Sequence, residues 1–185
     1  ASFVLDNVGN QTSASAIEKA LGAGGHRVSA ETIDNYLSLM QKAHLIYRCD
    51  RYDIRGKERL RTNGKYYVVD PGLRNRVLGL RAGNRGHLTE NMVFLELIRR
   101  GYDVSVGTLP NAEIDFVVQD GRSISYVQVS ETVLDPTTLE RELTPFAKLS
   151  DGFPRVLITK DRTDYGRDGV RHVNLYDFLL GAPLP

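Results

Sequence analysis

The sequence has a single cysteine, no long hydrophobic run and no signal-peptide pattern, and each absence excludes a class of protein. Cys49 cannot form an internal disulfide, which favours a reducing compartment, and an isolated thiol does not indicate a zinc site. No apolar stretch approaches the ~20 residues that a membrane span requires. The N-terminus lacks the basic and then apolar pattern of a secretory signal. We therefore expect a cytoplasmic protein without a membrane partner.

A phosphate-binding loop is also missing. The glycine-rich runs GAGG (22–25) and RAGNRG (81–86) lack the lysine of the pattern G-x-x-x-x-G-K-[ST], so nucleotide hydrolysis cannot be assigned to these residues. The composition is otherwise typical of a globular protein. The chain has 185 residues, 41% hydrophobic and 25% charged, which is enough for one large domain or two small ones.

The net charge of +1 is unevenly distributed along the chain. Residues 48–85 carry a net charge of +7, whereas residues 1–47 carry −1 and residues 86–185 carry −5. Such asymmetry favours a surface for nucleic acid or for an acidic partner. The alternative is a solvated surface that offsets the acidic remainder of the chain.

The first part of the chain predicts two helices followed by a hairpin. The expected elements are helices over 13–23 and 29–43, strands over 45–52 and 65–70 around a charged turn region (53–64), and a short helix over 71–79. This order is typical of a winged-helix domain, placed over residues 1–80, in which the hairpin is the wing. One ring of the pair Tyr66-Tyr67 should be buried and the other exposed.

Positive charge lies in the predicted wing rather than in helix 29–43, which carries Glu31 and Asp34. We therefore expect DNA or RNA to contact the wing without base-specific reading by that helix. Winged helices also dock proteins, so a protein-docking or sensor domain without nucleic acid is an alternative. The expected nucleic-acid-binding residues are Arg51, Arg55, Lys57, Arg59, Arg61 and Lys65.

After a glycine-rich break over residues 79–87, the amino-acid composition of the chain changes. The expected elements are a helix (88–101), strands (103–109, 113–119 and 123–130), a helix (137–149) divided at Pro145, strands (154–160 and 170–175) and a final helical turn (176–181). This order predicts an α/β (α+β) domain with a mixed central sheet over residues 81–185. The fold class of the whole chain is therefore α/β.

Four positions in this second part could carry metal-dependent phosphodiester chemistry. Glu90 lies on the first helix, Asp115 at the start of one strand, and Gln128 and Ser130 lie two apart on the next strand, so the last pair shares a sheet face. Mg²⁺ prefers oxygen ligands, which makes Glu90, Asp115 and Gln128 its candidate ligands. Glu113 could face the same way as Asp115.

The expected cation of such a site is missing from this pattern. Ser130 occupies the position at which a metal-dependent nuclease site would carry a lysine, and serine brings no positive charge. Arg141 or Lys148, on the following helix, could supply a migrated cation. Each residue also has a structural explanation: Glu90 can favour its helix N-terminus, Glu96 can pair with Arg99 or Arg100, and the four histidines show no ligand spacing.

Seven segments of the sequence together resemble a known protein family. RYDIRGKERL, KYYVVDPGLRN, HLTENMVFLELIRRGYDVSVG, EIDFVV, YVQVSET, ERELTPFAKLSDGFPRVLITKD and DGVRHVNLYDFLLG resemble, in unbroken order, the C-terminal region (DUF4143) of predicted prokaryotic AAA+ ATPases. The resemblance implies a winged-helix segment followed by a PD-(D/E)xK nuclease-like, restriction-endonuclease-like domain. It also implies an N-terminal ATPase domain in cis, which would bind the ATP.

The resemblance carries nuclease-type positions onto Glu90, Asp115, Gln128 and Ser130. Because Ser130 departs from the catalytic pattern, we expect a degenerate site in a nucleic-acid- or partner-binding module. An active Mg²⁺-dependent nuclease with a migrated cation is the alternative.

Overall fold

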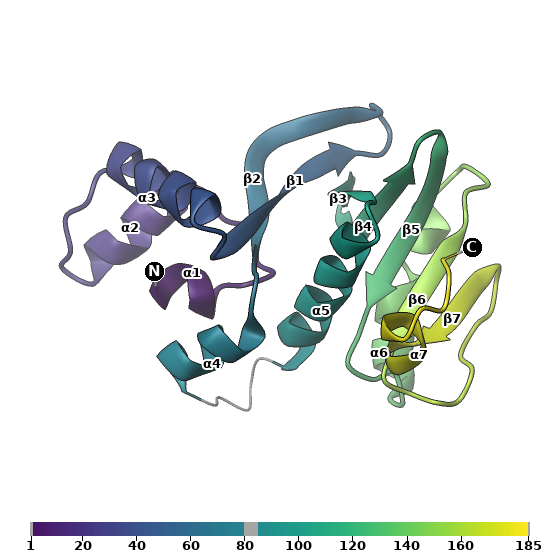
Figure 1. The fold of residues 1–185 in the computed structure, drawn as a ribbon. Coiled ribbons are helices and arrows are strands. Elements are labelled where there is room, and N and C mark those ends of the chain that lie inside the picture. The colour runs from purple at the N-terminus through teal and green to yellow at the C-terminus, as the bar shows by residue number, and fades with distance from the viewer. Residues whose placement is uncertain (1, 80–84, 185) are drawn as a thin grey trace.

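A single mixed sheet organises the protein. The computed structural model describes residues 2–79 and 85–184, without the side chains of Arg61 and Arg85. Within these residues seven strands form one sheet in the order β2-β1-β3-β4-β5-β6-β7 (Figure 1). The strands are β1 (Ile46–Asp53), β2 (Glu58–Val68), β3 (Asp103–Leu109), β4 (Ala112–Asp120), β5 (Ser123–Val129), β6 (Arg155–Thr159) and β7 (Val170–Asn174). The predicted α/β fold class is confirmed.

Helices flank this sheet on both faces and extend from one end of it. They are α1 (Ser2–Asp6), α2 (Ala14–Ala23), α3 (Ala30–Lys42), α4 (Pro71–Leu78), α5 (Arg85–Arg99), α6 (Pro136–Leu143), the 3-10 helix η2 (Phe146–Lys148) and α7 (Leu175–Leu179). Helices α2 and α3 lie beside the sheet, at its β2 end (Figure 1). No described helix is long and apolar enough to cross a membrane.

Alternating side chains of the central strands fill two buried clusters. Phe116 and Val118 pack in the same cluster as Phe94 of α5. Val117, which lies between them in sequence, packs instead with Phe146 of η2. Because neighbouring residues of a strand point to opposite faces, α5 covers one face of the sheet and the α6–η2 segment covers the other.

Local signals place most helix ends correctly. Ser13 and Ser29 cap α2 and α3 by accepting hydrogen bonds from backbone N–H groups, and Asp70 and Asp135 do the same ahead of prolines at the starts of α4 and α6. Pro145 separates α6 from η2 as expected.

Several expectations about the bounds of the elements and about burial were wrong. Strand β2 begins at Glu58 rather than at residue 65, because the charged segment pairs with β1 down to Asp53↔Glu58. Tyr66 and Tyr67 are both buried, since β2 is covered on both faces. Helix α1 was not anticipated, and α5 starts three residues earlier than expected.

The hairpin β1–β2 is not a free wing. Its strand β1 pairs in parallel with β3, through Arg51↔Val106, Tyr52↔Gly107 and Asp53↔Thr108. Both parts of the sequence therefore share one sheet, and the large cluster contains Tyr67 of β2 together with Leu97 of α5. The predicted boundary between residues 80 and 81 and most of the glycine-rich break lie outside the described residues.

Candidate functional site

Four elements place charged and amide side chains close together. Helix α5 supplies Glu90, strand β4 supplies Glu113 and Asp115, and β5 supplies Gln128. The sequence pattern anticipated these four residues. The fourth element is β2, whose Lys65 reaches into the same group. We call Lys65, Glu90, Glu113 and Asp115 the lysine–carboxylate cluster.

Lys65 lies at the centre of this cluster. Its ammonium Nζ lies 2.9 Å from Oε1 of Glu90, 2.6 Å from Oε1 of Glu113 and 3.9 Å from Oδ1 of Asp115. The lysine side chain is only 5% exposed. A buried charge requires partners, and these carboxylates supply them. Lys65 was expected on a nucleic-acid-binding surface; the structure places it inside the protein instead.

Further polar groups hold the two glutamates. Tyr67, two residues after Lys65 on the same face of β2, donates its hydroxyl to Oε1 of Glu90 over 2.6 Å. His87 Nδ1 lies 3.8 Å from the other oxygen of Glu90, one turn earlier on α5. Gln11 donates its side-chain amide to Glu113. Glu90 is therefore held by residues of β2 as well as by its own helix.

The side chains of Asp115 and Gln128 link β4 and β5 beyond the last regular pair of the two strands. The backbone N–H of Asp115 donates to Oε1 of Gln128 over 2.7 Å, and the backbone N–H of Val129 donates to Oδ2 of Asp115 over 2.8 Å. These side-chain bonds continue the β4–β5 pairing beyond Phe116↔Val127. The amide oxygen of Gln128, expected as a metal ligand, accepts a backbone hydrogen bond instead.

The environment shifts the cluster's pKa values in opposite directions. Burial opposes ionisation of Glu90, yet the Lys65 charge, the nearby His87 and the hydrogen bond from Tyr67 lower its pKa. Burial and the neighbouring Glu90 charge raise the pKa of Asp115 well above its usual range. Burial opposes the charge on Lys65, but the three carboxylates outweigh it and raise the lysine pKa. The lysine is therefore held charged, whereas Asp115 is less acidic than an exposed aspartate.

These residues do not fit a divalent cation. The ammonium of Lys65 takes up the space among the carboxylates, and Gln128 is turned toward a backbone N–H. Among the described residues there is no group of three or more His, Cys, Asp or Glu side chains able to hold a metal ion.

The remaining expected site residues lie elsewhere. Ser130 is buried and donates its hydroxyl to the carbonyl of Thr132 over 3.1 Å. Arg141 forms an ion pair with its neighbour Glu142 at 2.8 Å, and Lys148 donates to the carbonyl of Asn111 over 3.0 Å. Neither candidate for a migrated cation contacts the lysine–carboxylate cluster in these interactions.

Sequence reasoning missed Lys65, Tyr67 and His87 as members of the site. The spacing of His87 and Glu90, three residues apart on a helix, was available as a signal. For Lys65 and Tyr67 the sequence signal was weak: the two residues are two positions apart, which places them on one face of a strand. Nothing local indicated that this face meets α5.

The basic residues of the hairpin differ in how accessible they are. Arg55 and Lys57 are exposed in the turn after β1. Arg51 is half-buried and donates to the hydroxyl of Thr108 over 3.1 Å, and Arg59 pairs with Asp103. The side chain of Arg61 lies outside the described residues. Arg55 and Lys57 therefore carry the exposed charge of the turn.

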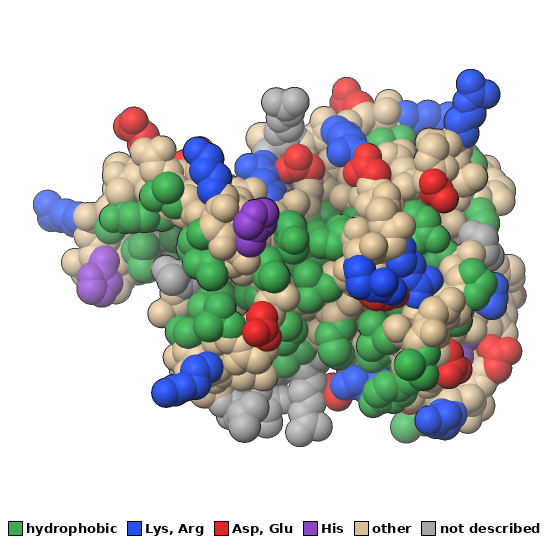
Figure 2. All heavy atoms as spheres, viewed as in Figure 1, with side chains coloured by type: hydrophobic (Ala, Val, Ile, Leu, Met, Phe, Trp, Pro, Cys, Tyr) green, Lys and Arg blue, Asp and Glu red, His purple; other side chains and the backbone are tan. Residues whose placement is uncertain are grey.

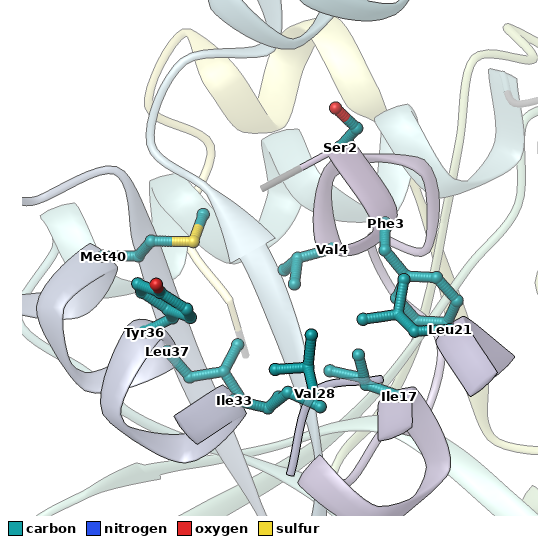
Figure 3. A pocket seen from close by; sticks show the side chains of 10 residues that line it. All are labelled: Ser2, Phe3, Val4, Ile17, Leu21, Val28, Ile33, Tyr36, Leu37 and Met40. Atoms are coloured by element: carbon teal, nitrogen blue, oxygen red, sulfur yellow. The ribbon is translucent and has the colours of Figure 1, made fainter. Parts of the chain in front are cut away.

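An apolar groove lies among the N-terminal helices. It has a volume of about 330 Å³ and is formed by α1, α2, α3 and the loop containing Val28 (Figure 3). Tyr36, one of its lining residues, is 61% exposed, and Leu39, also on α3, is 58% exposed. Figure 2 shows hydrophobic side chains gathered over this end of the molecule. The groove is lined by Ser2, Phe3, Val4, Ile17, Leu21, Val28, Ile33, Tyr36, Leu37 and Met40.

Comparison with known proteins gives a domain match and two longer relatives. Residues 2–84 match a domain of unknown function, DUF8612, a segment that contains Lys65 but not the carboxylates. The chain is 39% identical over 181 residues to an uncharacterized protein of Haemophilus influenzae, covering 96% of this chain and 44% of that protein. It is 31% identical over 150 residues to an uncharacterized protein of Methanocaldococcus jannaschii, covering 79% of this chain and 33% of the relative.

The chain thus spans less than half of the length of these curated relatives. No solved structure matches it significantly.

Proposed function

We propose that this chain is a binding module built on a nuclease-like frame that does not cleave phosphodiesters. One observation carries the proposal: the Lys65 ammonium lies among Glu90, Glu113 and Asp115, where metal-dependent cleavage would need a divalent cation. The element order α5, β3–β5, α6, β6 and β7 supports a restriction-endonuclease-like frame, and α2, α3 and the β1–β2 hairpin support a winged-helix segment.

A cleavage assay tests the missing activity. Wild type, Asp115→Asn and Glu113→Gln would be incubated with single- and double-stranded DNA and RNA in Mg²⁺ or Mn²⁺. We expect no cleavage by any of them. Cleavage by the wild type that both substitutions abolish would contradict the proposal and favour the alternative of an active nuclease.

Protein is the partner class that the surface favours. Tyr36 and Leu39 extend the groove of α1–α3 into an exposed apolar surface, and such surfaces mark interaction sites in soluble proteins. Because the curated relatives are more than twice as long as the aligned region, we propose that the partner is another part of a longer protein. By resemblance this part would be an ATPase domain in cis.

Hydrogen exchange tests this docking. Amides of α3 and residues 43–45 should exchange more slowly in the longer protein than in the isolated chain, because docking covers them. Tyr36→Ser with Leu39→Ser should remove that protection without lowering the stability of the chain, since both side chains are exposed. Lys19→Ala on the polar face of α2 is the matched control. Equal exchange in both proteins would contradict docking at this face.

Nucleic acid is a second candidate partner, favoured by the exposed charges of Arg55 and Lys57. A phosphate interface weakens steeply as salt rises, and each lost contact lowers that dependence by about one in the slope of log K against log salt. Arg55→Ala with Lys57→Ala should therefore flatten the salt dependence of binding to a DNA duplex. Arg99→Ala, on α5, is the control. An unchanged slope would exclude the hairpin as the contact.

A further inference from the structure

We infer that the ammonium of Lys65 is a built-in substitute for the divalent cation of a nuclease site. This inference rests on the proposed nuclease-like frame and identifies what occupies its site. The ammonium contacts two carboxylates that come from different elements, Glu90 of α5 and Glu113 of β4. Asp115 completes the group at 3.9 Å. A single buried positive charge therefore joins α5 and β4, two of the elements that carry the expected metal ligands.

The geometry favours an ammonium over a metal ion. Mg²⁺ requires oxygen ligands at about 2.0–2.1 Å in octahedral geometry. The distances of 2.9 Å and 2.6 Å from Nζ to the two glutamates are instead those of charge-assisted hydrogen bonds. A metal could enter only if Lys65 left the cluster, and the lysine side chain is enclosed by the protein.

The neighbouring groups are arranged for the lysine as well. Tyr67 already donates to the Glu90 oxygen that Lys65 contacts. Oδ2 of Asp115 and Oε1 of Gln128 each accept a backbone N–H. These hydrogen bonds hold Glu90, Asp115 and Gln128 in place and leave Oδ1 of Asp115 on the side of Lys65.

The substituting charge comes from outside the nuclease-like frame. Lys65 belongs to β2, in the segment that matches DUF8612, whereas Glu90, Glu113 and Asp115 belong to α5 and β4. The two parts of the sequence therefore complete one cluster. Removing the ammonium should free the oxygens of Glu90 and Glu113 and Oδ1 of Asp115 to move together around a divalent cation.

Manganese binding tests the inference directly. Mn²⁺ would be titrated into ¹⁵N-labelled wild type, and paramagnetic broadening of the backbone amides of Glu90, Glu113 and Asp115 would be followed by NMR. We expect no selective broadening at these positions. Selective broadening that Glu113→Gln abolishes would overturn the inference, and this measurement does not depend on whether any lysine variant folds.

The variant Lys65→Ala gives the converse test. We expect it to bind Mn²⁺ with selective broadening at the same amides and with a rise in melting temperature that Mn²⁺ does not cause in the wild type. Adding Glu113→Gln should weaken that binding by about tenfold or more. A folded Lys65→Ala that binds no Mn²⁺ would also overturn the inference. Neither result depends on cleavage, so the inference can fail while the non-cleaving binding function stands.

Discussion

Asn91 of α5 forms two hydrogen bonds with the backbone of Val68 in β2. The N–H of Val68 donates to Oδ1 of Asn91 over 2.8 Å, and Nδ2 of Asn91 donates to the carbonyl of Val68 over 2.9 Å. The side-chain amide thus pairs with β2 as the next strand of a sheet would. Both residues are buried, and they adjoin the lysine–carboxylate cluster, because Asn91 directly follows Glu90 and Val68 lies three residues after Lys65.

We predict that Asn91→Ala destabilises the protein by about 2–4 kcal/mol, because it leaves a buried donor and a buried acceptor of Val68 without partners. Urea unfolding followed by circular dichroism measures the change. Asn10→Ala, at an exposed position, is the control and should change the free energy of unfolding by no more than about 0.5 kcal/mol. A loss at Asn91 as small as that of the control would show that the pairing contributes little.

The raised pKa of Asp115 predicts a pH-dependent gain in stability for Asp115→Asn. A carboxyl whose pKa is higher in the folded than in the unfolded state binds more protons when folded, so its contribution to stability falls as pH rises between the two values. Asparagine removes that loss and can still accept the N–H of Val129. The variant should therefore gain on the wild type above the usual carboxyl pKa, by up to about 1.4 kcal/mol per pH unit.

Urea unfolding of both proteins from pH 5 upward tests this expectation. Glu113→Gln, with its more exposed carboxyl, serves as the comparison. A difference between wild type and Asp115→Asn that stays constant with pH would contradict the shift.

Two neighbouring arginines should differ sharply in their effect on stability, although both pair with Glu96. Arg100 is 13% exposed, and it also donates to the carbonyls of Phe178 and Ala182 and lies over the Phe178 ring. Arg100→Ala should cost about 1.5–3 kcal/mol, because these carbonyls at the end of α7 lose charged donors. Arg99 is 68% exposed, and Arg99→Ala should change little.

Thermal and urea unfolding of the two arginine variants, side by side, give the comparison. Equal losses would mean that the ion pair with Glu96, which both residues share, outweighs the contacts with α7.

A side chain at Gly107 should be poorly tolerated. A Cβ added there would lie 2.8 Å from Cβ of Ile114 and 2.9 Å from side-chain atoms of Ile54 and Val117. We predict that Gly107→Ala destabilises the protein by about 1–3 kcal/mol through overpacking. Gly152→Ala, where a Cβ meets no atom within 4 Å, is the control. Equal unfolding midpoints for the two variants would show that the strands relax easily.

Local chemistry made much of the fold predictable. The caps at Ser13 and Ser29 and the aspartate–proline starts of α4 and α6 act within a few residues, so sequence alone places them. A pair of Glu96 with Arg99 or Arg100 was likewise expected from helical spacing, and Glu96 pairs with both.

Interactions between distant segments set the limit of this prediction. The parallel pairing of β1 with β3, and the approach of Lys65 to Glu113, join residues about fifty positions apart. The charged residues 58–64 contain no apolar alternation, so their strand depends on pairing with β1 rather than on propensity. The carboxylates of the site were found from their order, whereas its cation was sought on the following helix rather than on a preceding strand.

The parallel pairing between β1 and β3 also bears on how the protein can be divided for experiment. A fragment that began at residue 85 would lose β1, and the backbone of β3 from Val106 to Thr108 would then form the edge of the sheet. Unpaired strand edges recruit strands from other molecules and lead to aggregation. A shortened protein of this kind would therefore be prone to precipitate, and the hairpin acts as a protective cover for the sheet that follows it.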